Sequence, residues 1–199
     1  MTFQTIAGQL GKTGLCVCPN FLTNRVLQNT ATDLELIHAS GKFHRAGIGR
    51  DRAETGVRSD ETFWLNRDLK NGAQGSLWRR IDALKRRFNR SLFLGLTDFE
   101  GHYAVYPEGG YYERHTDQFC GTSERIISFV LYLNRDWKAP DGGRLRVYGV
   151  NANNVESYTE IDPVGGTMVC FLSESPHEVM LSHRQRCSFT GWFKGPVKK

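Results

Sequence analysis

The sequence lacks an apolar run long enough to cross a membrane. No uninterrupted stretch approaches the roughly 18 residues that a spanning helix needs, and the N-terminus has neither the basic start nor the apolar core of a signal peptide. We therefore expect a cytoplasmic protein without a membrane partner. Glycine-rich motifs with the spacing of phosphate-binding or dinucleotide-binding loops are also missing, which argues against enzymes that use phosphate-bearing cofactors.

Cysteine is scarce and irregularly spaced. The five cysteines are an odd number, and no two of them form a Cys-x-x-Cys pair. The pattern therefore indicates neither a disulfide framework nor a zinc site. We expect most of the cysteines to behave as small buried apolar residues. They are Cys16, Cys18, Cys120, Cys170 and Cys187.

Positive charge exceeds negative charge along the chain. The formal net charge is +5, and cations crowd the segment from Arg79 to Arg90. Apolar residues recur there at helical spacing, which favours an amphipathic helix with a solvated basic face, capped by Ser76 and fading near Asn89. A patch that binds nucleic acid is the alternative interpretation. The apolar stripe consists of Leu77, Ile81, Leu84 and Phe88.

The first sixty residues predict a strand, a helix and an irregular stretch. Residues 14–18 favour a short strand, and residues 22–37 favour a helix because their apolar members fall on one side. Between Ser40 and Asp60 the pattern is lost, and glycines are interleaved with cations. Such a stretch cannot bury much, so we expect a loop at the surface.

The second half of the chain is a series of short extended runs, rich in β-branched and aromatic residues and separated by turn residues. Strands at this spacing favour a jelly roll, or cupin-like double-stranded β-helix, whose mouth can hold a ligand. We predict a mainly β fold in which N-terminal helices pack outside one sheet. One domain is expected over residues 1–199, with helical support to about residue 95 and the jelly-roll core over about 96–195. The strand candidates are residues 101–106, 111–115, 126–133, 144–148, 157–161, 167–172, 177–180 and 186–193.

His115, Asp117 and His177 form a candidate metal site. A His and an Asp two residues apart in a strand point to the same face, and a second His from a distant segment completes two imidazoles and one carboxylate. This set suits non-haem iron(II) and leaves coordination positions open. Arg186, nine residues after His177, supplies a cation for an anionic ligand. The other histidines are expected to be surface or hydrogen-bonded residues: His38, His44, His102 and His183.

Longer motifs around these residues resemble those of the iron(II)- and 2-oxoglutarate-dependent prolyl hydroxylases, in particular the branch that contains the hypoxia-factor prolyl hydroxylases and their bacterial relatives. The resemblance covers about residues 103–193 and continues more faintly over residues 57–64, which are similar to the family's mobile substrate loop. Its motifs are Tyr-Glu-Arg-His-Thr-Asp, Leu-Tyr-Leu-Asn-Arg-Asp-Trp, Gly-Gly-Arg-Leu-Arg, Pro-His-Glu-Val and Arg-Cys-Ser-Phe-Thr-Gly-Trp-Phe.

The resemblance implies that His115, Asp117 and His177 bind iron(II), and that Arg186 pairs with the distal carboxylate of 2-oxoglutarate. An arginine fork matches a carboxylate bidentately, which lysine does less well. Tyr132 is similar to the family's tyrosine that helps to hold the same carboxylate. The other residues implied for the cosubstrate pocket are Thr190, Trp192 and Tyr106.

The substrate implied by the resemblance is a protein that carries a target proline. Arg125 is similar to an arginine near the family's substrate entrance, and the stretch from about Gly47 to Asp60 is expected to close over the peptide. Within that stretch, Arg50, Arg52 or Arg58 could select acidic flanks.

The implied reaction uses iron(II), 2-oxoglutarate and dioxygen, releases succinate and carbon dioxide, and can use ascorbate as a reductant. Two oxygenase alternatives stay open, in which the substrate is a small molecule or a methylated nucleic acid. The run after Arg186 has no second arginine, which disfavours the nucleic acid. A non-catalytic barrel that binds a metal or an organic acid is the alternative of another class. The oligomeric state is not indicated.

Overall fold

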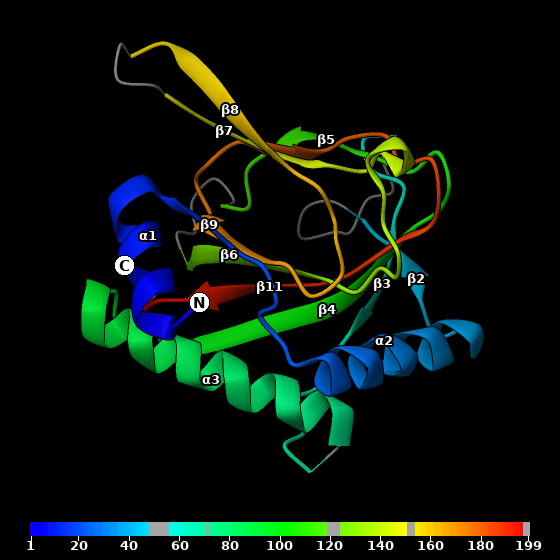
Figure 1. The fold of residues 1–199 in the computed structure, drawn as a ribbon, viewed down its shortest axis with the longest axis horizontal. Coiled ribbons are helices and arrows are strands. Elements are labelled where there is room, and N and C mark those ends of the chain that lie inside the picture. The colour runs from blue at the N-terminus through cyan, green and yellow to red at the C-terminus, as the bar shows by residue number, and fades with distance from the viewer. Residues whose placement is uncertain (48–55, 71, 119–123, 151–153, 197–199) are drawn as a thin grey trace.

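The structure is a computed structural model that describes residues 1–47, 56–70, 72–118, 124–150 and 154–196. Within these residues the strands form two antiparallel sheets of seven and four strands that face each other, and the helices lie on the outer side of the larger sheet (Figure 1). This architecture confirms the prediction of a mainly β fold with helices outside one sheet.

The larger sheet has the order β1-β9-β6-β11-β4-β3-β2. All of its pairings are antiparallel, and the longest run from β4 to β11, where nine consecutive residues of each strand are in register. The β4–β11 pairing is therefore the most extensive pairing among the described strands. The bounds are β1 Leu15–Cys18, β2 His44–Arg45, β3 Glu61–Trp64, β4 Asp98–Tyr106, β6 Arg125–Tyr132, β9 Met168–Leu172 and β11 Arg186–Lys194.

The central strands of this sheet are buried on both faces. Side chains alternate along a strand, so Phe99, Tyr103 and Val105 of β4 enter the core under the helices, whereas Ala104 and Tyr106 enter a second core between the sheets. The even-numbered residues of β4 therefore turn toward the space between the two sheets.

The smaller sheet has the order β5-β10-β7-β8 and covers the second core. His115 at the end of β5 lies directly opposite His177 at the start of β10, so the pairing of two short strands brings residues about sixty positions apart side by side. The bounds are β5 Tyr112–His115, β7 Leu145–Val150, β8 Glu156–Ile161 and β10 His177–Val179, and a short 3-10 helix spans Ala139–Asp141.

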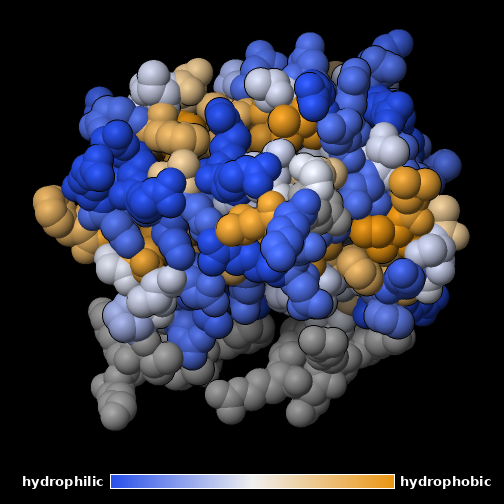
Figure 2. Space-filling model, turned by 90° about the horizontal axis from the view of Figure 1, so that it is seen from below, coloured by the Kyte–Doolittle hydropathy of each residue, from blue (hydrophilic) through white to orange (hydrophobic). Residues whose placement is uncertain are grey.

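Helix α3, Gly72–Leu92, contains the predicted apolar stripe, and all four of its residues are fully buried. The prediction that Ser76 caps this helix is wrong, because the helix begins at Gly72 and the Ser76 hydroxyl donates to the Gly72 carbonyl. The face below the large sheet is predominantly hydrophilic, with apolar side chains in separate patches (Figure 2). The helix predicted over residues 22–37 is α2, Asn24–Ala39.

Helix α1, Phe3–Thr13, was not predicted from the sequence. Two glycines at positions 8 and 11 weaken its helical pattern, but Ile6, Ala7 and Leu10 give it a buried face. At Gly11 a Cβ atom would lie 2.6 Å from Leu92 Cδ2, so a larger residue there would require the Leu92 side chain to move. Among the described residues, no helix is long and apolar enough to span a membrane.

The predicted loop between Ser40 and Asp60 contains more strand pairing than its sequence indicates. β2 pairs with β3, and the Ala46 amide donates to the Asp60 carbonyl. Residues 57–59 pair with residues 111–113 beside β5. The flank of this stretch is therefore bound to both sheets through backbone groups, which composition does not reveal. Arg50 and Arg52 fall outside the described residues.

The cysteines largely follow the expectation. Cys16, Cys18 and Cys170 are buried and Cys187 is half-buried, and all four are free thiols. Burial raises the pKa of the Cys16 thiol to about 11, so these groups behave as apolar core atoms. Cys120 falls outside the described residues.

Candidate active site

A cavity of about 870 Å³ lies between the two sheets. Nine of the ten site residues predicted from the sequence line it, and the tenth, Tyr132, is fully buried beside Arg186. The fold therefore brings together residues from five strands, from the segment that follows β5 and from the segment that precedes β3. The lining residues from the prediction are Arg58, Tyr106, His115, Asp117, Arg125, His177, Arg186, Thr190 and Trp192.

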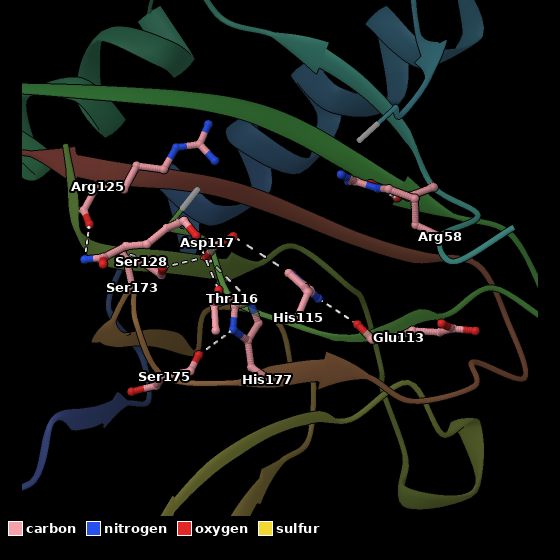
Figure 3. A network of polar contacts seen from close by, with 12 residues as sticks. Arg58, Glu113, His115, Thr116, Asp117, Arg125, Ser128, Ser173, Ser175 and His177 are labelled. Atoms are coloured by element: carbon pink, nitrogen blue, oxygen red, sulfur yellow. Dashed lines mark hydrogen bonds and ion pairs between the residues drawn. The ribbon is translucent and has the colours of Figure 1, made fainter. Parts of the chain in front are cut away.

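His115, Asp117 and His177 line this cavity and lie close together (Figure 3). One ligand atom from each lies within 4.8 Å of the others. Asp117 Oδ1 is 3.9 Å from His115 Nε2, and Asp117 Oδ2 is 3.5 Å from His177 Nε2. Two nitrogens and one oxygen on one side of a common point are the donor set of a facial triad for iron(II).

The backbone orients both imidazoles. His115 Nδ1 is 2.7 Å from the Glu113 carbonyl, and His177 Nδ1 is 3.0 Å from the Ser175 carbonyl. A carbonyl only accepts, so each Nδ1 carries a proton, and in the neutral ring Nε2 keeps a free lone pair. The two lone pairs are the ones that face Asp117, as metal ligation requires.

Asp117 is held by the larger sheet. The Ser128 hydroxyl of β6 donates to Asp117 Oδ2 at 2.6 Å, and Ser128 also lies 3.0 Å from the Ser173 hydroxyl (Figure 3). The Asp117 amide donates to the Ser173 carbonyl. Ser128 thus engages Oδ2, whereas Oδ1 is the oxygen that faces His115 Nε2.

The protonation states suit a metal site. Burial, together with the neighbouring His177, lowers the pKa of His115 to about 4. Burial alone would raise the pKa of Asp117, but the imidazoles of His177 and His115 and the Ser128 hydrogen bond outweigh it and lower that pKa. At neutral pH, His115 is therefore neutral and Asp117 is ionised, which are the forms that bind a cation.

Arg186 places a buried positive charge in the lining of the cavity. Its side chain is 2% exposed, and its Nε donates to the Gly143 carbonyl at 3.0 Å. No carboxylate of the described residues lies within ion-pair distance of it, so its charge is uncompensated by the protein there. Buried charges are normally paired, and this one is therefore suited to an anionic ligand.

Two tyrosines flank this cation. The rings of Tyr106 and Tyr132 each lie 5.1 Å from Arg186 Cζ. The Tyr132 hydroxyl is buried without a hydrogen-bond partner, and burial raises its pKa to about 12, so it stays protonated. An unsatisfied hydroxyl beside an unpaired guanidinium fits a carboxylate that accepts from both.

The two residues predicted to face the substrate are both engaged within the protein. Arg125 donates to Glu100 Oε1 at 3.0 and 2.8 Å and lies 3.6 Å above the Trp192 ring. Arg58 donates to the Asp60 carboxylate through Nε and Nη2 at 2.7 and 2.6 Å. Both side chains shape the wall of the cavity.

Arg58 also begins a stack that ends on a candidate metal ligand. Its Cζ lies 4.4 Å from the Tyr112 ring centroid, and the Tyr112 ring lies 3.5 Å from the His115 ring at an interplanar angle of 17°. The His115 imidazole is thus fixed by a parallel ring on one side and by the Glu113 carbonyl at its edge.

The sequence interpretation gave no site role to most of the other lining residues, among them Tyr112, Trp64 and His102. Tyr112 was quoted only as part of a motif, Trp64 only as part of an apolar run, and His102 was expected to be a surface or hydrogen-bonded residue. His102 is instead 4% exposed and lines the cavity. The signal that could have found it is its even-numbered position in β4, on the same face as Tyr106.

Residues 101–194 match the sequence profile of the 2OG-Fe(II) oxygenase superfamily. The human protein Egl nine homolog 1 is 27% identical over 205 aligned positions, which cover 97% of this chain and 46% of the human protein. The chain thus spans about half the length of this curated relative.

Two solved structures match nearly the whole chain. A prolyl-4-hydroxylase from Pseudomonas putida is 35% identical, covers 98% of this chain and 99% of its own, and superposes with a TM-score of 0.86. A prolyl hydroxylase from Trichoplax adhaerens, in complex with a hypoxia inducible factor peptide fragment, is 27% identical, with coverages of 96% and 88% and a TM-score of 0.86.

Proposed function

Since the chain belongs to the 2OG-Fe(II) oxygenase superfamily, we propose that it is a prolyl hydroxylase that acts on a protein substrate. The observation that carries this proposal is one cavity in which the His115, Asp117 and His177 group faces the unpaired Arg186. The near-complete match to a bacterial prolyl-4-hydroxylase supports proline as the target.

Iron(II) would be held by Nε2 of His115, Nε2 of His177 and a carboxylate oxygen of Asp117. The two carbonyl contacts fix the tautomers, and Ser128 keeps the carboxylate oriented, so little reorganisation is needed on binding. Three protein ligands leave further positions on the ion for other molecules.

The distal carboxylate of 2-oxoglutarate would be held by Arg186 and by the hydroxyl of Tyr132. The free guanidinium edge and the unpaired hydroxyl lie in the same buried place, and Thr190 lines the cavity nearby on the same strand as Arg186. When bound, iron and 2-oxoglutarate supply the oxidising chemistry, in which dioxygen is consumed, succinate and carbon dioxide are released and one oxygen atom is added to the substrate.

The protein's own part is to place the reactants and exclude water. Val130, Phe171 and Val179 give the cavity apolar walls, which strengthens electrostatic interactions inside it. Lys42 and Arg45 line the cavity as well, and these cations support a protein substrate with acidic residues near the proline. A cytoplasmic location completes the proposal.

The test is proline oxidation in cell-extract proteins treated with the enzyme, iron(II), 2-oxoglutarate and ascorbate, with the Asp117→Ala variant as the matched control. Mass spectrometry should find an added oxygen atom on proline only with the intact enzyme. In parallel, a prolyl peptide should stimulate 2-oxoglutarate turnover, whereas free proline and methylated DNA should not. Absence of any oxidised proline would remove the proposal, and stimulation by DNA alone would replace it.

A further inference from the structure

Resting on the proposed function, we propose that Trp64 and His102 form a subsite that binds the substrate residue next to the target proline. The Trp64 ring offers a flat apolar surface for that residue's side chain. A ring nitrogen of His102 forms a hydrogen bond with the peptide group of the same substrate residue. The ligand class is an extended prolyl segment of a protein. The subsite is separate from the proposed iron ligands and from the proposed 2-oxoglutarate site at Arg186.

The location of the subsite follows from strand register. Trp64 of β3 lies directly opposite His102 of β4, and His102 lies opposite Thr190 of β11. Trp192 stands two residues farther along β11, on the same face, opposite Ser128. Because Ser128 bonds Asp117, this row of side chains begins at the candidate metal site.

The row forms a continuous aromatic wall. The His102 ring centroid lies 4.7 Å from that of Trp64 and 5.4 Å from that of Trp192, and the two indoles are 6.1 Å apart. Trp192 is almost fully buried, whereas Trp64 is 41% exposed. The wall therefore runs from the metal site outward to solvent, along the path that a peptide must follow to present one residue to the iron.

His102 has an unsatisfied hydrogen-bonding atom. Its Nδ1 is buried and has no partner, and an unpaired buried polar atom costs about 1–3 kcal/mol. Burial and the nearby Arg58 and Arg125 cations lower the pKa of His102 to about 3, so the ring is neutral in the cell. The His χ2 torsion is broad and roughly two-fold, so a ring rotation can turn this nitrogen toward a ligand in the cavity.

An extended prolyl peptide suits both features. Proline-rich segments are extended, expose their peptide groups and dock on aromatic surfaces. The occupant is constrained further by continuity, because the wall adjoins the place where the target proline must sit. A neutral histidine between two indoles would not favour a charged ligand. The aromatic wall would therefore bind the uncharged residue next to the proline, and the cations that line the cavity would bind acidic residues of the substrate.

The test measures peptide binding without turnover. Immobilised enzyme loaded with iron(II) and 2-oxoglutarate under anaerobic conditions is exposed to a library of acetylated, amidated heptapeptides with central proline, and to a matched library with central alanine. Retained peptides are counted by mass spectrometry. Trp64→Ala and His102→Leu should each lower prolyl-peptide retention by about tenfold, as expected for loss of one stacking or hydrogen-bonding contact.

Conservative and remote variants serve as controls. Trp64→Phe and His102→Gln should restore most of the retention, because they keep a ring and a hydrogen-bonding group. Tyr158→Ala, which removes an exposed aromatic residue outside the cavity lining, should match the intact enzyme. For Trp64→Ala and His102→Leu, the loss of peptide retention should exceed any change in the dissociation constant of 2-oxoglutarate.

The outcomes separate this proposal from the proposed function. If the intact enzyme oxidises proline in cell extracts but Trp64→Ala and His102→Leu retain peptides like the intact enzyme, the subsite is refuted and the hydroxylase survives. If the intact enzyme does not prefer the central-proline library, the subsite is refuted as well. If no protein proline is oxidised, it is the hydroxylase proposal that fails.

Discussion

Replacing Arg186 with lysine should weaken 2-oxoglutarate binding while leaving iron binding in place. The substitution keeps a positive charge on β11 but removes the planar fork, which is what matches a carboxylate at two points. In the structure, Nε of Arg186 donates to the Gly143 carbonyl, which holds the guanidinium plane, and Cζ lies 5.1 Å from the Tyr132 ring centroid. A lysine ammonium has no equivalent anchor.

The magnitude follows from the contact that is lost. A hydrogen bond to a charged group contributes about 1.5–3 kcal/mol. At about 1.4 kcal/mol per factor of ten, this loss corresponds to a dissociation constant for 2-oxoglutarate that rises by roughly 10-fold to 150-fold. The upper part of this range is the more relevant, since Arg186 is 2% exposed and water cannot replace the missing donor.

The assay is an anaerobic titration of the iron(II)-loaded enzyme with 2-oxoglutarate, with bound iron measured in the same samples. Arg184→Lys is the matched control, because Arg184 lies two residues away but is exposed and paired with Asp141; it should bind 2-oxoglutarate normally. Urea unfolding of Arg186→Lys checks that the variant is folded. A folded Arg186→Lys with unchanged affinity would place the carboxylate elsewhere and refute the reasoning.

Three further expectations concern the metal site and its surroundings. His115→Ala and Asp117→Ala should each abolish iron-dependent 2-oxoglutarate turnover with little loss of fold, and retained turnover, with bound iron measured alongside, would contradict the proposed ligands. Tyr112→Leu should weaken iron(II) binding by roughly 3-fold to 10-fold, because an aromatic contact contributes about 0.5–1.5 kcal/mol, whereas Tyr112→Phe should bind normally; equal affinities in a metal titration would exclude the stack as a support for His115. The lowered pKa of His102, about 3 against 6.5, means that its contribution to stability is fully present above pH 6.5 and is lost as the pH falls toward 3. At pH 5 the loss is about 2 kcal/mol relative to pH 8, and urea unfolding of His102→Leu should show a pH dependence smaller by that amount.

The second half of the fold could be predicted because its signals are local. Each of the eight extended runs between residues 101 and 193 is a strand in the structure, with ends that differ by a few residues. Two signals predict these strands: alternation of apolar and polar side chains, and turn residues between the strands. Both are properties of short segments and do not depend on what the segments pack against. Two of the candidate metal ligands could be proposed from a local signal as well, since His115 and Asp117 belong to one motif.

Features that depend on pairing between distant segments could not be predicted. The sequence of residues 57–60 predicts a loop because its composition is polar, yet the backbone of this segment is hydrogen-bonded to Ala46 on one side and to residues 111–113 on the other. That pairing is what brings Arg58 over Tyr112, 54 positions later. Composition indicates whether a segment is polar enough to contact water, whereas its backbone hydrogen bonds depend on which other segment of the chain lies beside it.

His102 is the clearest case of the same limit. A histidine in a strand is usually at the surface, and that expectation holds wherever one face of a sheet meets solvent. β4 is central, however, with helices over its odd-numbered residues and the smaller sheet over its even-numbered residues, so it has no solvent face. A polar residue in such a strand must either be satisfied inside the protein or face a cavity, and the unpaired Nδ1 of His102 excludes complete satisfaction. The position of β4 within the sheet, rather than its sequence, therefore turns an ordinary histidine into part of the cavity wall.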